Sequence, residues 1–291
     1  MELTEISEKS IASLTRLVAS YQGRFADFTV GYQYMWADAY RLAFGEAVGV
    51  GFLTTGVGPR VIAPPVPPVG RERAFADALY AAFSENPRIA VLDRQTADAF
   101  SLVFGDRAVI STDPATHDYL YTAESLSTFG GKKLAAKRNH LNAFLRLYPD
   151  YTVRAIDAET LPYARGFLSR YRTEEEDDSP TARAEGMAAE RLLNAFPLLP
   201  LCGILLFVGG EAVGLSVGEM QGDTLFIHVE KAKRELRGAY PMLVRELVSR
   251  AMPTAVYVNR EEDDGDHGLR QSKLSYRPTA IIEKYTVEIL Y

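Results

Sequence analysis

The order in which strand and helix patterns follow one another constrains this sequence more than any other feature. Between residues 151 and 290, hydrophobic periodicity predicts the order β-α-α-β-β-β-α-β-α-β. Two hairpin turns separate the central strands, one at Gly209-Gly210 and one at Gly222-Asp223. The first half predicts three antiparallel strands followed by helix, strand, helix and strand, which is a similar order. Because this pattern occurs twice, we expect two α/β domains in tandem, although no residue-level repeat is visible.

The expected elements are short and spread over both halves of the chain. In the first half we expect helices at 7–20, 71–83 and 95–103, and strands at 40–44, 47–54, 60–63, 88–92, 108–111 and 119–121. In the second half we expect helices at 158–171, 181–196, 238–250 and 268–275, and strands at 151–156, 202–208, 212–220, 224–230, 255–258 and 279–290.

A long helix at 125–148 is expected to connect the halves. Its Gly130-Gly131 pair should weaken or bend it, because each glycine costs ~1 kcal/mol relative to alanine in a helix. The expected domains are therefore 1–123 and 150–291, with a connecting helix at 124–149.

Composition excludes several classes of protein. With 47% hydrophobic and 24% charged residues, the 291-residue chain can bury a large core and is not disordered. A net charge of −6 argues against a surface that binds polyanions everywhere, and the single Cys202 excludes an internal disulfide. The acidic N-terminus lacks a signal-peptide pattern, and the longest apolar run, 201–208, is too short to span a bilayer. We expect a cytoplasmic protein.

Isolated histidine, cysteine and aromatic residues carry little signal. The four histidines lie far apart in the sequence, without metal-ligand spacing, so no metal is predicted. Cys202 is expected to be an inert core thiol. Trp36 and the nearby tyrosines form either an aromatic platform or part of the first domain's core.

Three stretches carry a resemblance to a known family. They are GKKLAAKRNHLN at 131–142, VNREEDDG at 258–265 and GLRQSKLSYRP at 268–278. Together they are similar to soluble, largely uncharacterised bacterial proteins related to the C-terminal domain of phosphatidylglycerol lysyltransferase. The resemblance extends over about residues 25–291.

The resemblance implies a fold and a reaction class. It implies an α/β (α+β) protein with two GNAT-like acyltransferase domains in tandem, joined by a helical connector, as in the Fem-type peptidyl transferases. Characterised relatives transfer an aminoacyl group from a charged tRNA. We expect no multi-helix membrane portion before the domain, so a lipid acceptor does not follow from the resemblance.

A coenzyme A site would lie at the start of the helix expected at 238–250, where backbone N–H groups can hold a pyrophosphate. The usual pattern is Gln/Arg-x-x-Gly-x-Gly/Ala. Arg237 and Gly238 stand at the right places, but Glu235 replaces the first residue and Tyr240 the second small one. Coenzyme A thus remains a candidate cofactor with an off-pattern loop. The alternative is that Gly238 only eases the start of the helix.

A basic segment runs from Lys132 to Arg146, with five Lys and Arg residues and no acid. At 100° per residue, Lys137 and Arg138 flank an apolar stripe. They either bind an anion, such as a tRNA phosphate or a nucleotide, in a groove between the domains, or belong to a solvated helix face.

Acidic and basic residues also follow the strand expected at 255–258. Ligands favour the carboxyl ends of strands in an open sheet, and Glu230, which ends the preceding strand, should reach the same edge. Glu230 and Glu261 are the candidate catalytic residues, as a general base or as a grip on a substrate amine, with Arg260 steadying a carboxylate or phosphate. The alternative is that Asn259 caps a turn and the acids form a solvated loop.

The candidate substrate-binding residues share polar or basic chemistry near these segments or a small size where a phosphate would approach. Arg270 and Lys273 share a helix face, and Lys273 either neutralises the acidic loop or binds a donor phosphate. The set comprises Lys133, Lys137, Arg138, Asn139, Lys231, Arg237, Gly238, Asn259, Arg260, Arg270, Lys273 and Tyr276.

The resulting hypothesis is an acyl- or aminoacyl-transferase that acts on an amine or hydroxyl acceptor in a cleft between the domains. Its donor would be an aminoacyl-tRNA or an acyl-coenzyme A. One alternative is a catalytically silent ligand-binding or regulatory module, which the off-pattern Glu235 and Tyr240 favour. The other is a coenzyme A-dependent N-acetyltransferase.

Overall fold

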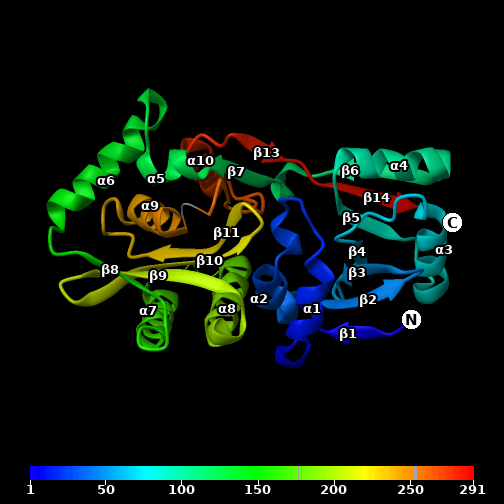
Figure 1. Cartoon of the computed structure of the whole chain (residues 1–291), viewed down its shortest axis with the longest axis horizontal. Helices are drawn as coiled ribbons and strands as arrows, with labels where there is room; N and C mark the ends of the chain where they lie inside the picture. The colour runs from blue at the N-terminus through cyan, green and yellow to red at the C-terminus, as the bar shows by residue number, and fades with distance from the viewer. Residues whose placement is uncertain (176, 178, 252–253) are drawn as a thin grey trace. The chain divides into compact units, whose positions relative to one another are not determined.

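The chain folds as two compact units, shown in Figure 1. The computed structural model describes residues 1–175, 177, 179–251 and 254–291. The first unit comprises Met1–His117 and Ile282–Tyr291, and the second comprises Asp118–Ile281. The expected domains and these units divide the chain at different places, because the last strand joins the first unit. No helix within the described ranges has both the length and the apolar character needed to cross a bilayer.

The first unit is built on a seven-stranded sheet in the order β1-β2-β3-β4-β5-β14-β6. Helix α4 packs on β5, β6 and β14, and α1 contacts α2. The core beneath them contains Phe52, Phe75 and Phe100, all fully buried. The elements are β1 Leu3–Glu5, α1 Ile11–Val18, α2 Val30–Tyr40, β2 Ala43–Ala47, β3 Val50–Thr54, β4 Val61–Ala63, α3 Glu72–Phe83, β5 Arg88–Leu92, α4 Arg94–Phe104, β6 Ala108–Thr112 and β14 Tyr285–Ile289.

The second unit is built on another seven-stranded sheet, in the order β13-β7-β12-β11-β10-β9-β8. Helix α9 covers one face, with α5 and α6 beside it, and α7 and α8 cover the other face (Figure 1). The elements are β7 Asp118–Thr122, α5 Ala123–Thr128, α6 Ala135–Leu147, β8 Thr152–Ala155, α7 Leu161–Glu174, α8 Pro180–Asn194, β9 Leu201–Val208, β10 Glu211–Gln221, β11 Thr224–Ala232, α9 Ala239–Ala251, β12 Tyr257–Asn259, α10 His267–Ser275 and β13 Ala280–Ile282.

The prediction of one strand at 279–290 is wrong, because this stretch contributes β13 to the second sheet and β14 to the first. Lys284 lies between them and is buried, with its Nζ 2.5 Å from Oδ2 of Asp27. Its carbonyl oxygen accepts a hydrogen bond from the Thr112 hydroxyl at 2.9 Å. A buried ion pair and this hydrogen bond therefore fix the point where the chain changes sheets.

The prediction of one connecting helix at 125–148 is also wrong. Phe129, with φ of 47°, adopts the left-handed conformation that ends α5, and Gly131, with φ of 76°, precedes the next turn. A single 3-10 turn at Lys132–Leu134 then leads into α6. Nη1 of Arg138 donates to the carbonyl oxygens of Phe129 and Gly131. Arg138 therefore holds the corner between the two helices.

The aromatic segment before residue 41 forms α2, which the sequence did not predict, and the strand expected at 40–44 begins only at Ala43. Thr29 caps the helix by accepting from the backbone N–H of Tyr32. Trp36 is half-buried and lies 6.5 Å from Tyr32 and 5.5 Å from Tyr40, measured between ring centroids. The aromatic residues thus line one side of a helix, because a cap and tertiary packing override the strand preference of tyrosine.

The pairing of β11 with β12 leaves part of β11 without a neighbour on one side. The parallel pairing covers only Thr224–Phe226 against Tyr257–Asn259, whereas β11 continues to Ala232. On its other side β11 carries one extra residue, His228, because Ile227 and Val229 oppose the consecutive Gly218 and Val217 of β10. Such a bulge redirects side chains locally. Strands β11 and β12 therefore diverge after Phe226, and the candidate residues Glu230 and Arg260 lie beyond this point.

Gly238 leads into α9 at a point of close contact with α6. Its φ is 88°, and a Cβ added there would lie 2.2 Å from the carbonyl oxygen of His140. We therefore expect Gly238→Ala to lower the free energy of unfolding by about 2–3 kcal/mol, through backbone strain and overpacking. Urea unfolding followed by circular dichroism measures this, with Gly210→Ala, at an open turn, as a control for positive φ alone. Equal losses in both variants would contradict the packing argument.

Candidate functional site

Glu230 and Arg260 form an ion pair where β11 and the chain after β12 diverge. Nε and Nη2 of Arg260 lie 3.0 and 2.8 Å from Oε2 of Glu230. The two side chains are only 9% (Arg260) and 12% (Glu230) exposed. Oε1 of Glu230 and Nη1 of Arg260 are buried without a hydrogen-bond partner in the described part of the chain. One acceptor and one donor therefore remain unsatisfied at the same place, which is rare for buried polar atoms.

Lys137 of α6 reaches the same place over an aromatic ring. Its Nζ lies 3.8 Å from the centroid of the Tyr276 ring, and the Arg260 guanidinium lies 4.4 Å from that centroid. Tyr121 of β7 completes the group, 5.9 Å from the guanidinium. We call these five residues, Lys137, Glu230, Arg260, Tyr276 and Tyr121, the Lys137 cluster.

The electrostatics of the Lys137 cluster lower the pKa of its lysine. Burial, and then the positive charge of Arg260, lower the pKa of Lys137 to about 8. Burial raises the pKa of Tyr121 and Tyr276, so both phenols stay neutral. The cluster thus presents a half-buried lysine that is partly deprotonated near neutral pH, next to a fixed anion and a fixed cation.

Glu261, the second candidate catalytic residue, pairs with His228 instead. Nδ1 of His228 lies 2.6 Å from Oε1 of Glu261, and its Nε2 lies 3.6 Å from Oε2 of Glu219. Burial alone would lower the pKa of His228, but the nearby carboxylates of Glu219 and Glu261 outweigh it and raise the pKa to about 9. His228 is therefore a buried cation between two carboxylates. The sequence analysis missed both His228 and Glu219.

Lys273 and Asn259 shape the loop that carries Arg260. Nζ of Lys273 donates to the carbonyl oxygens of Arg260 at 2.6 Å, Glu261 at 3.1 Å and also Glu262. Asn259 accepts from the backbone N–H of Glu261 at 2.6 Å, which supports the turn alternative. Both residues thus hold the backbone in place.

Arg270 belongs to a neighbouring network. Its Nε and Nη2 donate to the two carboxylate oxygens of Asp263 at 2.8 and 2.9 Å, and Tyr119 donates to Oδ2 of Asp263 at 2.5 Å. This bidentate pair neutralises part of the acidic loop.

The other candidate residues lie outside the Lys137 cluster. Nζ of Lys231 pairs with Glu185 at 2.7 Å, and Arg138 binds the helix corner described above. Gly238 packs against α6, while Lys133, Asn139 and Arg237 are exposed.

A separate cavity of about 790 Å³ lies between α7 and α8 and contains none of the candidate residues. Its arginines are engaged, since Arg165 donates to the carbonyls of Leu193 and Asn194 and Arg172 pairs with Glu190. Among the described residues, no group of three or more His, Cys, Asp or Glu side chains could hold a metal ion.

Comparisons with known proteins bear on this arrangement. A conserved protein of unknown function from Bacteroides thetaiotaomicron is 26% identical and superposes with a TM-score of 0.90, covering 99% of both chains. L-PGS from Bacillus licheniformis is 14% identical with a TM-score of 0.66, covering 98% of this chain and 93% of its own. FemX is 10% identical with a TM-score of 0.61, covering 100% and 98%.

Among curated sequences, an uncharacterised protein of Mycoplasmoides gallisepticum is 28% identical over 177 residues. The match covers 60% of this chain and spans only 56% of that relative's length.

These likenesses confirm the predicted tandem GNAT-like fold, with its two seven-stranded sheets. The sequence profile described as "Phosphatidylglycerol lysyltransferase, C-terminal" matches residues 19–288. The family resemblance seen in the sequence is thereby confirmed, and the chain belongs to the family of the phosphatidylglycerol lysyltransferase C-terminal domain.

Proposed function

We propose that this protein transfers an aminoacyl group from the 3′ ester of an aminoacyl-tRNA to an amine or hydroxyl acceptor at the Lys137 cluster. The observation that carries the proposal is the Glu230–Arg260 pair, whose two unsatisfied atoms lie beside a lysine of lowered pKa. Membership in a family named for a lysyltransferase, and the fold shared with L-PGS and FemX, support a transferase.

In the proposed reaction Glu230, Arg260 and Lys137 have separate roles. Oε1 of Glu230 accepts from the ammonium group of the aminoacyl donor, and Nη1 of Arg260 donates to its ester carbonyl. The acceptor's nitrogen or oxygen attacks the carbonyl carbon, and its proton passes to the neutral amine of Lys137. The bond to the tRNA 3′ oxygen then breaks, and Lys137 returns the proton to that oxygen. The cleft between domains that the sequence analysis expects remains a prediction.

The residues at the start of α9 do not fit coenzyme A. The side of Gly238 on which a Cβ would lie is occupied by the His140 carbonyl of α6, so no phosphate can approach Gly238 from that side. The hydroxyl of Tyr240 lies 3.5 Å from that of Tyr171. The bulky side chain of Tyr240 thus occupies the second small position of the coenzyme A pattern and contacts Tyr171. We derive no step through coenzyme A.

Changing Glu230 tests the grip on the donor ammonium. We expect Glu230→Gln to raise KM for the charged tRNA about 30-fold, because the amide oxygen still accepts a hydrogen bond but carries no negative charge to pair with the ammonium. The matched control is Glu185→Gln. Glu185 lies in α8 and pairs with Lys231, which follows Glu230 in β11, so this variant also removes one negative charge and should leave KM within about twofold.

The assay uses bulk tRNA charged with ¹⁴C-labelled amino acids and two acceptors in separate tubes. One tube holds phosphatidylglycerol vesicles, as a hydroxyl acceptor, and the other a lysine-containing peptide, as an amine acceptor. Transfer of label to either acceptor supports the proposal and identifies the acceptor class. Charged tRNA that keeps its label in both tubes would overturn it and favour the catalytically silent module.

A further inference from the structure

Ser216 of β10 and Glu230 of β11 face each other across the second sheet. The two residues are direct partners in the antiparallel pairing of these strands. Directly opposed residues project their side chains from the same face of a sheet, with Cβ atoms about 4.5–5.5 Å apart. The hydroxyl of Ser216 therefore lies beside the carboxylate of the Lys137 cluster.

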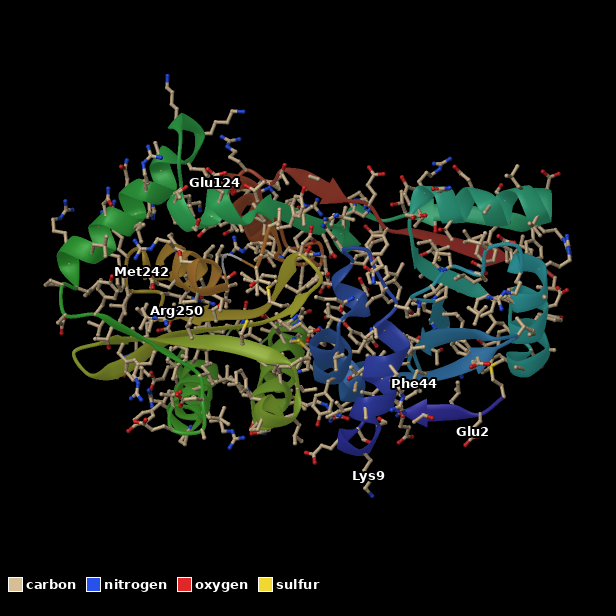
Figure 2. The ribbon with its side chains drawn as sticks, viewed as in Figure 1. Glu2, Lys9, Phe44, Glu124, Met242 and Arg250 are labelled. Atoms are coloured by element: carbon tan, nitrogen blue, oxygen red, sulfur yellow. The ribbon has the colours of Figure 1, made fainter. Side chains whose placement is uncertain are left out.

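The core on this face of the sheet gives the same placement. On its other side Ser216 pairs with Ile204 of β9. Ile204 belongs to the hydrophobic core cluster that also contains Tyr121 and Tyr276. Met242 of α9, labelled in Figure 2, belongs to the same core cluster. Ser216 thus projects from the face of the sheet on which the two tyrosines of the Lys137 cluster pack.

The hydroxyl of Ser216 is buried and is not used by the fold. The residue is 0% exposed, and its Oγ has no hydrogen-bond partner within the part of the chain that the structure describes. Oε1 of Glu230 and Nη1 of Arg260 are buried in the same condition. A buried polar atom without a partner destabilises the fold, whereas a bound ligand can supply the partner. The three atoms together therefore have the properties of a binding site for a polar group.

We propose that Ser216 determines donor specificity. Together with Glu230 it binds the primary ammonium group of the donor and thereby restricts transfer to aminoacyl esters whose amino group is unblocked. This inference rests on the proposed function, in which Glu230 alone holds the ammonium group. An ammonium group carries three N–H bonds, so it can donate to the carboxylate and to the hydroxyl at the same time.

An N-acylated donor would not satisfy this pair of oxygens. Its amide nitrogen is uncharged and carries one N–H bond, so it can donate to only one of the two. Its acyl group would also need space beside two enclosed side chains, since Ser216 is 0% exposed and the Glu230 side chain 12% exposed. The pair therefore distinguishes a free amino group from a blocked one.

The test compares two donors that differ only at the amino group. One is bulk tRNA charged with ¹⁴C-labelled amino acids, and the other is the same material after N-acetylation with acetic anhydride. Both are used with the phosphatidylglycerol and peptide acceptors. We expect the wild-type protein to favour the free donor by about 100-fold or more in kcat/KM. Ser216→Ala should raise KM for the free donor about tenfold, because it removes one hydrogen bond to a charged group, and should leave KM for the acetylated donor unchanged.

Unfolding in urea separates this role from a structural one. Ser216→Ala should be at least as stable as the wild type, because it removes a buried hydroxyl that the fold leaves unsatisfied. The matched control is Ser10→Ala. The Ser10 hydroxyl is also buried, but it donates to the carbonyl oxygen of Glu5 at 2.8 Å, so this variant should be less stable than the wild type and keep its KM.

The outcomes distinguish this inference from the proposed function. Equal use of the two donors by the wild-type protein would overturn the inference and leave the proposed function in place. So would a Ser216→Ala variant with unchanged KM for the free donor, or one that loses as much stability as Ser10→Ala. Label that stays on the tRNA with both donors would contradict the proposed function itself, and the inference with it.

Discussion

Replacing Lys137 with methionine is expected to lower kcat for aminoacyl transfer about 1000-fold while leaving the fold intact. General bases contribute about 10²–10⁴ to rates, and they work best when their pKa lies near the operating pH. Lys137 meets this condition because burial and Arg260 lower its pKa to about 8. Methionine retains the length and the contact with Tyr276 but cannot accept a proton.

The pH profile separates a proton acceptor from a fixed positive charge. Because the neutral amine is the active form, the wild-type rate should rise with pH and level off above about pH 8, after subtraction of spontaneous ester hydrolysis. Lys137→Arg keeps a charge at every accessible pH and should be as slow as Lys137→Met. Rescue by arginine, or a rate that falls above pH 8, would contradict the role as base. Lys132→Arg, at an exposed position in the turn before α6, is the matched control and should keep the wild-type profile.

Lys273→Met is expected to produce the largest loss of stability, about 3–5 kcal/mol, since it removes one partner from a buried charged network. Three carbonyl oxygens, those of Arg260, Glu261 and Glu262, would lose their shared donor. Burial lowers the pKa of Lys273, yet the nearby Glu262 and Glu261 favour its charged form.

Equilibrium unfolding in urea measures this loss. Lys233→Met is the control, because its Nζ pairs with Glu211 in an exposed position at 2.8 Å and should contribute about 0–1 kcal/mol. A Lys273→Met variant as stable as the control would show that the carbonyl cage does not hold the loop.

Local turn chemistry explains why much of the second sheet could be predicted. Gly209 and Gly210 have φ of 58° and 81°, as a two-residue hairpin with both central residues at positive φ requires. Alternating and buried runs then predict β9, β10 and β11 within about two residues of their observed limits. The break in the last predicted strand, which the sequence does not indicate, depends on a residue far away in the sequence. The chain changes sheets at Lys284, whose charge is neutralised by Asp27, a residue far away in the sequence.

The convergence of Glu230 and Arg260 could be predicted because it follows from a rule about the ends of parallel strands. The pairing of Glu261 with His228 could not, because it depends on a bulge that adds one residue to β11. Helical periodicity places Lys137 at the edge of an apolar stripe, but nothing in the sequence indicates that its amine lies over Tyr276. Periodicity thus located the helix, while tertiary packing decides which of its lysines is buried.

The most direct test of the central claim compares two donors with the wild-type protein. One reaction contains bulk tRNA charged with ¹⁴C-labelled amino acids, and the other contains ¹⁴C-acetyl-coenzyme A, each with the phosphatidylglycerol and peptide acceptors. The account predicts that label passes from the tRNA to an acceptor and that none passes from coenzyme A. Transfer of acetyl groups, with the aminoacyl label still on the tRNA, would contradict it.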